Sequence, residues 1–149
     1  MSATQTTAPV RPARRTALAL ARTAEPHTAL RRFLALDAVV TGVNGLAYLA
    51  ASGPLGRLLG VGSATLLGLG AFLTVYAAGV GLLAGRTRPA ALPVRAVIEA
   101  NAVWAVLSCV ALALWLSPTL VGEAWTVAQA LVVAGFAALQ QTALKARDN

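Results

Sequence analysis

Four polar side chains recur along one apolar stretch of the sequence at the spacing of a helix. They stand at offsets of 0, 4, 7 and 11 residues: Asp37, Thr41, Asn44 and Tyr48. These offsets follow the helical period of about 3.6 residues, so the side chains share one face. A carboxyl group, an amide and hydroxyl groups on one face have the chemistry to carry a proton, to bind a polar ligand or to hydrogen-bond to neighbouring helices.

Further polar groups stand inside two later apolar stretches: Glu99 and Asn101 in one, Gln129 and Gln140 in the other. Glu99 lies about 160° from Asn101 around a helix. It also follows Arg95 by four residues, which predicts an ion pair between these two side chains. Counted from the same edge of their stretches, Asp37 and Glu99 are predicted to lie about 6–8 Å deep. The spacing therefore predicts an inner layer that contains carboxyl groups and a central layer of neutral polar groups.

Together these side chains form a candidate intramembrane polar site: Asp37, Thr41, Asn44, Glu99, Asn101, Gln129 and Gln140. Two interpretations of this site are open. In the structural one, the helix N-terminus and nearby arginines stabilise Asp37, while amides and hydroxyls join the helices. In the functional one, Asp37 and Glu99 form a proton-carrying or ligand-binding pair. The structural interpretation is favoured.

The sequence offers few of the groups that enzymes use. Its one histidine, His27, lies in a polar N-terminal segment, and its one cysteine, Cys109, is predicted to be a small packing residue. It contains no phosphate-binding loop, no C-x-x-C pair and no metal-ligand spacing. We therefore expect a protein that is not an enzyme, without catalytic residues, metal or cofactor.

The elements that must position these side chains are membrane spans. Of the 149 residues, 58% are hydrophobic and 11% are charged, whereas an ordinary soluble domain has about 25% charged residues. The mean hydropathy is +0.72. Four apolar blocks are long enough to cross a bilayer core of about 30 Å, at residues of about 33–51, 64–84, 94–116 and 120–140. The predicted fold class is all-α, a four-helix transmembrane bundle.

The remaining segments are predicted to be unstructured or short. Residues 1–30 are rich in Thr, Ala, Pro and Arg and are expected to form a disordered basic cytoplasmic tail. Within this tail, residues 13–22 have the composition of a short basic helix on anionic lipid headgroups. Residues 31–145 are expected to hold the bundle, and 146–149 a short cytoplasmic tail. Segment 54–63 is too short to span and is expected at the outer interface.

Basic residues determine the expected orientation. Eleven of the twelve precede the first span, follow the second or end the chain, and Arg57 alone lies on the other side. Because an excess of Lys and Arg marks the cytoplasmic side, both termini are predicted to be cytoplasmic. The Arg-rich, Ala-rich composition is typical of a high-GC bacterial genome, so the expected location is the bacterial inner membrane. The arginines flank apolar blocks and form no stripe with aromatics, so no nucleic-acid partner is expected.

Small residues line one face of the second predicted span: Gly70, Thr74, Ala78, Gly81 and Gly85. Gly81 and Gly85 form a G-x-x-x-G pair, which allows two helix backbones to approach closely. Packing inside the monomer is the favoured interpretation of this stripe. A dimer face is the alternative.

The stretch from Glu99 to Gln141 resembles a group of small four-span bacterial membrane proteins. The likeness rests on residues 100–104, 116–119, 128–130 and 138–140, and Asp37 in its Gly-containing span fits the same group. The resemblance covers about residues 30–145. These proteins are described only as hypothetical integral membrane proteins. The resemblance therefore implies the four-span fold, and it implies no activity, ligand or catalytic residue.

Three classes of function stay open. The first is a non-enzymatic accessory or scaffold protein that packs in the lipid bilayer against another membrane protein or a second copy. The second is a small proton-coupled transporter or permease that acts as an oligomer through the inner polar layer. The third is a membrane enzyme with Asp37 and Glu99 as an acid–base pair. It ranks last, because nothing supplies a nucleophile or a metal.

Overall fold

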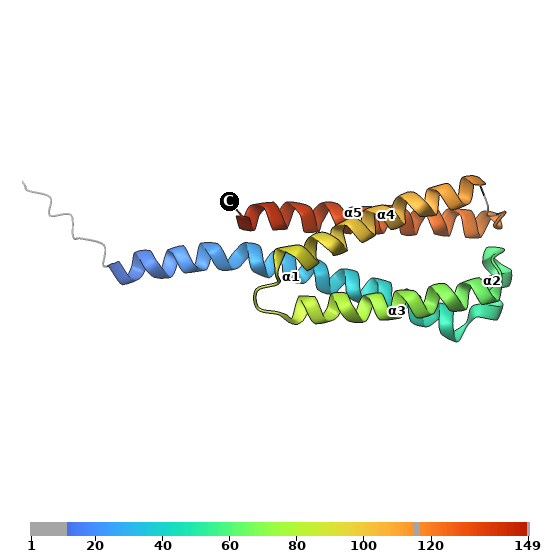
Figure 1. The fold of residues 1–149 in the computed structure, drawn as a ribbon, viewed down its shortest axis with the longest axis horizontal. Coiled ribbons are helices and arrows are strands. Elements are labelled where there is room, and N and C mark those ends of the chain that lie inside the picture. The colour runs from blue at the N-terminus through green and yellow to red at the C-terminus, as the bar shows by residue number, and fades with distance from the viewer. Residues whose placement is uncertain (1–11, 115–116, 149) are drawn as a thin grey trace, which may run out of the picture.

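The protein is described by a computed structural model that covers residues 12–114 and 117–148, with side chains from residue 27 onward (Figure 1). Within these ranges the chain forms helices and no strands: α1 (Pro12–Ala50), α2 (Ser52–Leu59), α3 (Ser63–Gly85), α4 (Ala91–Leu114) and α5 (Leu120–Asp148). Four described helices are long and apolar enough to cross a membrane, namely the His27–Ala50 part of α1, then α3, α4 and α5. The predicted all-α, four-span fold is confirmed.

Both ends of the described chain differ from the prediction. Residues 12–30, expected to be disordered apart from a short basic helix at 13–22, continue α1, and residues 146–148, expected to be a tail, belong to α5. Residues 13–24 consist largely of Ala, Arg and Leu, which favour helix. Extending an existing helix also avoids the cost of nucleation, and Pro12 stands in the first turn, where its missing N–H is not needed. Residues 1–11 and 149 lie outside the described ranges.

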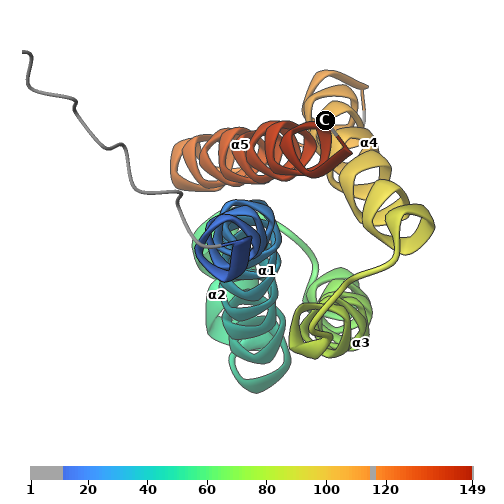
Figure 2. The same ribbon diagram turned by 90° about the vertical axis from the view of Figure 1, so that its left-hand side faces the viewer.

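The spans pair as two antiparallel hairpins. α1 packs along α3, and α4 packs along α5 (Figure 1). The two hairpins meet mainly through α1 and α5, whereas α3 and α4 barely touch. Figure 2, which looks from the end where α1 begins and α5 ends, shows the spans around the bundle in the order α1, α3, α4, α5. We call this end the terminal end and the opposite one the distal end.

Glycines bring α1 and α3 into close contact. A Cβ atom added to Gly45 would lie 2.7 Å from Thr74 Oγ1, and one added to Gly70 would lie 2.9 Å from the Gly45 carbonyl oxygen. Gly45 and Gly70 are both buried. Only the absence of a side chain therefore allows the two backbones to come this near.

The predicted stripe of small residues divides between two environments. Gly70, Thr74 and Gly81 face α1, and the Cβ position of Gly81 lies 3.8 Å from Ala38 Cβ. Ala78 is exposed, and a Cβ on Gly85 would meet nothing within 4 Å. The stripe thus packs inside the monomer along part of its length, and its partner glycine in α1 was not predicted.

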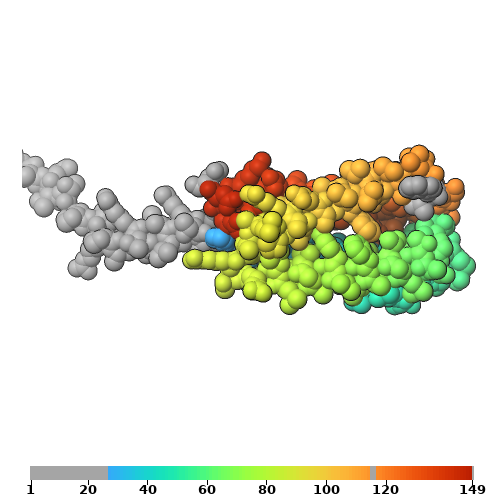
Figure 3. Space-filling view, viewed as in Figure 1, coloured from blue at the N-terminus to red at the C-terminus, as the bar shows by residue number. Residues whose placement is uncertain are grey.

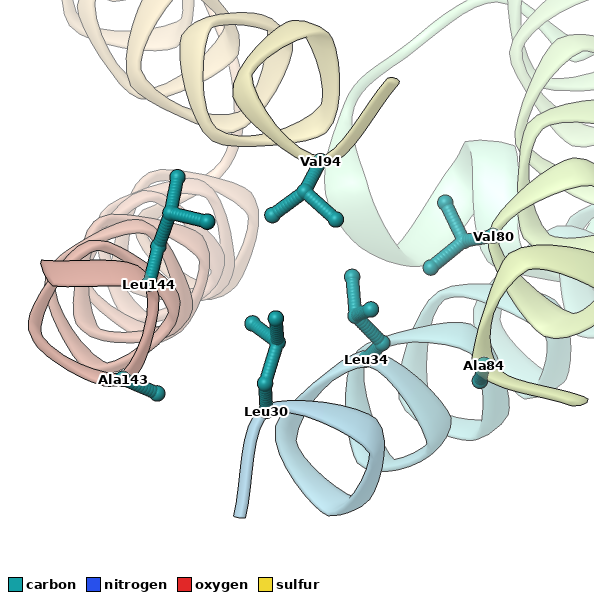
Figure 4. Close-up of a cluster of buried hydrophobic side chains, with 7 residues drawn as sticks. All are labelled: Leu30, Leu34, Val80, Ala84, Val94, Ala143 and Leu144. Carbon is teal, nitrogen blue, oxygen red and sulfur yellow. The ribbon is translucent and has the colours of Figure 1, made fainter. Parts of the chain in front are cut away.

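The terminal end is held by an apolar core to which all four spans contribute. Figure 4 shows these side chains converging: Leu30, Leu34, Val80, Ala84, Val94, Ala143 and Leu144. Arg31 adds a polar contact, because its Nε donates to the carbonyl of Ala84 at 3.0 Å. This carbonyl belongs to the last turn of α3, where no intrahelical donor remains.

The distal end is closed by the short helix α2. Gly60, at a φ of +71°, ends α2 in the left-handed conformation that favours glycine. Thr119 then joins α2 to α5, since its N–H donates to Leu59 O at 3.1 Å and its Oγ1 donates to Leu58 O at 2.6 Å. Gly122 packs directly against the carbonyl of Leu59. The segment predicted at the interface is therefore a helix that links the two hairpins.

Candidate functional site

The carboxyl group of Asp37 is the centre of a hydrogen-bond network. Its side chain is fully buried. Asp37 Oδ1 accepts from Thr41 Oγ1 at 3.2 Å. Asp37 Oδ2 accepts from Asn101 Nδ2 at 2.7 Å and from Gln140 Nε2 at 2.8 Å. The carboxyl group therefore binds donors from α1, α4 and α5, three of the four spans.

Tyr76 connects the remaining span, α3, to this network. Its hydroxyl lies 3.1 Å from Asn101 Oδ1 and 3.3 Å from the Val97 carbonyl oxygen, within hydrogen-bond distance of both. Asn101 thus uses its amide nitrogen toward Asp37 and its amide oxygen toward Tyr76. We refer to Asp37, Thr41, Tyr76, Asn101 and Gln140 as the Asp37 network. It links all four spans through neutral groups around one carboxyl group.

No cation stands beside Asp37 in the described part of the chain. The ion pair found among the described residues joins Arg147 and Asp148 at the end of α5, at 3.1 Å. Arg31, one of the arginines expected near Asp37, donates to the carbonyl of Ala84 instead. Gln140 Oε1 is buried and has no hydrogen-bond partner among the described residues. The network therefore supplies donors to Asp37 and retains one buried acceptor beside it.

Glu99 does not join Asp37. Its side chain is exposed on the outer face of α4, and within the described ranges it forms no ion pair with Arg95. The cause is helical geometry: Asn101 faces the interior, so a residue two positions earlier faces almost the opposite way. The predicted inner layer thus contains one carboxyl group. The predicted Arg95–Glu99 pair is not formed, nor is the Asp37–Glu99 pair of the functional interpretation.

A second polar cluster surrounds the hydroxyl of Tyr48 in the distal half of α1. This oxygen accepts from Gln129 Nε2 at 2.6 Å and from Trp125 Nε1 at 2.8 Å. Both donors come from α5. Tyr48 and Gln129 are among the polar residues named from the sequence, whereas the hydrogen bond from Trp125 was not predicted.

Other side chains near the middle of the spans behave differently. Thr74 Oγ1 donates to the Gly70 carbonyl in its own helix at 2.7 Å. Trp104 stacks on Phe72, with ring centroids 5.6 Å apart. Asn44, half-buried in α1, has no side-chain hydrogen bond to any described residue. The predicted central layer is thus not one connected network.

Two cavities lie between the hairpins. The first measures about 380 Å³ and is lined from all four spans, including Thr41, Asn44, Phe72, Trp104 and Gln129. The second measures about 750 Å³ and lies toward α2. Asn44, Trp125 and Ala128 line both. Figure 3 shows the surface hollowed between the distal halves of α3 and α4.

The chemistry of this arrangement is that of hydrogen bonding rather than metal binding. The described residues hold no group of three or more His, Cys, Asp or Glu side chains close enough to bind one metal ion. Asp37 is not among the residues that line the cavities, whereas its partners Thr41 and Asn101 line the first. Comparisons of the sequence with protein-family models and with curated proteins, and of the structure with solved structures, found no match.

Proposed function

We propose that this chain is a non-enzymatic accessory or scaffold protein of the bacterial cytoplasmic membrane, with both termini on the cytoplasmic side, which associates with a second copy through α4. The observation that carries this proposal is the exposed, charged face of α4. Six residues follow one another at intervals of four and three along that face, and all six are exposed: Arg95, Glu99, Ala102, Val106, Cys109 and Ala113. We call these residues the α4 seam.

The spacing of the α4 seam is that of helices that pack against each other over several turns. Alternating steps of four and three average 3.5 residues, the repeat that keeps one face toward a partner helix. Ala102, Cys109 and Ala113 are small and would let two backbones approach closely. The seam is turned about 120° around α4 from Asn101, which the bundle already buries. It is therefore available for a contact outside the monomer.

Charge favours a second copy of this chain as the partner. An ionisable side chain within a span is expensive where it faces lipid, and neither Arg95 nor Glu99 has an ion-pair partner in the part of the chain that the structure describes. In a two-fold symmetric pair the same surface meets itself. Glu99 of each copy would then lie one helical turn from the partner's Arg95, within reach of its long side chain. A symmetric contact thus supplies both missing partners at once.

Cysteine cross-linking tests the association directly. Two parallel α4 helices that meet along the seam place Cys109 of the two copies together, and a disulfide needs Cα atoms within about 7 Å. We expect mild oxidation of native membranes to yield a disulfide-linked dimer on non-reducing gels. In the matched control, Cys109→Ser with Ala134→Cys, the cysteine is placed on the exposed face of α5 and should not cross-link.

Charge exchange adds a second criterion. Arg95→Glu places two acidic residues on each seam and should reduce cross-linking, and Arg95→Glu with Glu99→Arg should restore it. Equal cross-linking at positions 109 and 134, or a protein that stays monomeric in mild detergent, would contradict the proposal.

A second candidate, a small proton-coupled transporter, is favoured by one observation. The first cavity reaches two partners of the buried Asp37, and Gln140 beside it keeps an unpaired acceptor. This hypothesis expects pH-dependent solute flux in liposomes that disappears in Asp37→Asn. Flux equal to that of empty liposomes across a panel of solutes would count against it.

A further inference from the structure

The first cavity has flat, apolar walls. The rings of Phe72 and Trp104 stack at 5.6 Å with an interplanar angle of 9°, and Phe72 and Tyr76 stack at 6.2 Å and 17°. Valine side chains from α1 and α5 line the remainder. None of the lining residues is charged. A cavity of about 380 Å³ falls in the range of small-molecule sites, about 300–1,000 Å³.

Three polar groups that line this cavity have no partner among the described residues. They are the amide of Asn44, the indole N–H of Trp104 and the amide oxygen of Gln129, whose nitrogen alone is used by Tyr48. They come from α1, α4 and α5. A bilayer offers no water at this depth, so an unpaired amide or indole N–H is costly there. Convergent polar groups in an apolar cavity are typical of a binding site.

We propose that this cavity binds an uncharged, lipid-soluble ring compound that carries carbonyl or hydroxyl groups. The N–H groups of Asn44 and Trp104 would donate to its carbonyl oxygen, and the Gln129 oxygen would accept from a hydroxyl. The flat aromatic wall formed by Phe72 and Trp104 would contact the ring. A lipid acyl chain would fill the space but leave all three polar groups unpaired.

The entrance explains why the ligand is lipid-soluble. α3 and α4 contact each other in few places, mainly through the Phe72–Trp104 stack and the Tyr76 hydroxyl. Figure 3 shows the surface hollowed between their distal halves, on a side of the bundle that would face the bilayer. Thr41, Tyr76 and Asn101 of the Asp37 network line the cavity on its terminal side. The site is independent of the proposed association, because it lies on the inner face of α4 and the seam lies on the outer face.

Tryptophan fluorescence tests the proposal. The sequence has three tryptophans. The substitution Trp115→Phe leaves two of them, Trp104 and Trp125, and both line the cavity. We expect 2,3-dimethyl-1,4-naphthoquinone, which carries two carbonyl groups and does not add to thiols, to quench this protein saturably in detergent micelles. Asn44→Leu should raise the dissociation constant about fivefold through loss of one hydrogen bond.

Cavity filling provides the matched comparison. Ala128→Phe, in the wall of both cavities, should abolish saturable quenching, whereas Ala134→Phe on the exposed face of α5 should leave it unchanged. Asn44→Leu removes no hydrogen bond of the folded chain, so it decides the question even if Ala128→Phe fails to fold. Equal, unsaturable quenching in every variant would mean partition into the micelle and would overturn the proposal. Displacement of the quinone by hexadecane at equal concentration would also overturn it, because the occupant would then be an acyl chain.

Discussion

At the scale of single residues, Asp37 shows how a carboxyl group is held inside a membrane bundle without an ion pair. Its oxygens accept three hydrogen bonds from Thr41, Asn101 and Gln140. Hydrogen bonds to a charged group contribute about 1.5–3 kcal/mol each, more than neutral ones. Because Asn101 belongs to α4 and Gln140 to α5, their two bonds also fix the positions of these helices against α1. The structural interpretation of the polar stripe is therefore the one that this geometry supports.

We expect Asp37→Asn to lower the free energy of unfolding by about 2 kcal/mol. A neutral asparagine would keep one oxygen for the amides of Asn101 and Gln140 and turn its N–H₂ group toward Thr41 Oγ1, so the bonds to the carboxyl group would be replaced by weaker bonds between neutral groups. Thermal unfolding in a detergent that separates any dimer into single copies, followed by circular dichroism, measures the change. Glu99→Gln is the control: Glu99 is exposed and outside the network, so the expected change is within about 0.5 kcal/mol. Equal losses in the two variants would contradict the assignment of Asp37 as the centre of the network.

At the scale of helices, the packing of each span depends on which face carries small residues. α1 and α3 approach through Gly45 and Gly70, which meet each other's backbone. α4 has two unlike faces, one with Asn101 and Trp104 toward the bundle and one with the α4 seam outward. The short α2 is held by hydrogen bonds from Thr119 and by the packing of Leu55 and Leu59 against apolar side chains of α1 and α3.

Two glycine substitutions with opposite expected effects on stability test the α1–α3 contact. In Gly45→Ala the new Cβ would lie 2.7 Å from Thr74 Oγ1 and 2.8 Å from Thr74 N, so the helices must separate, at a cost of about 2 kcal/mol. In Gly79→Ala the Cβ meets nothing within 4 Å, and the better helix propensity of alanine should stabilise α3 by up to about 1 kcal/mol. Thermal unfolding of the two variants in the same detergent gives the comparison. A neutral Gly45→Ala would show that α1 and α3 are not held at this distance.

At the scale of the whole molecule, the bundle is two hairpins joined at both ends, with cavities between them. The terminal core and the Asp37 network join α1 to α5 at one end, and α2 joins the hairpins at the other. The cavities lie between these two joints. The described beginning of α1 and the end of α5 lie at the same end of the bundle (Figure 1), as an even number of spans requires.

Reporter fusions test which side of the membrane that end faces. Eleven of the twelve basic residues lie on the predicted cytoplasmic side, so alkaline phosphatase, which is active only outside the cytoplasm, should be inactive when fused after Asn149. Fusion within residues 117–119, between α4 and α5, should give activity. The reverse pattern would mean that the bundle is inserted with its termini outside.

Much of the fold was determined by the sequence itself. Four apolar blocks of sufficient length predict four spans because unpaired backbone groups cannot face lipid, so each block must be a helix. The connection between α4 and α5 is too short to cross the bilayer, so these two helices must form an antiparallel hairpin. The period of the polar stripe also placed Asp37 and Thr41 on one face correctly. The prediction failed at the ends of the chain, because a long helix continues into flanking segments without a new nucleation step.

Only the tertiary structure decided which groups meet. Spacing along a helix tells which residues share a face, but it does not tell which helix that face contacts. Tyr76 therefore entered the Asp37 network unpredicted, while Glu99, at the predicted depth, faces outward. The role of Gly45 in the close packing of α1 against α3 likewise becomes clear only from its contact with Gly70. Hydropathy places helices in a bilayer one by one, whereas hydrogen-bond partners and cavities depend on how those helices are rotated and tilted against one another.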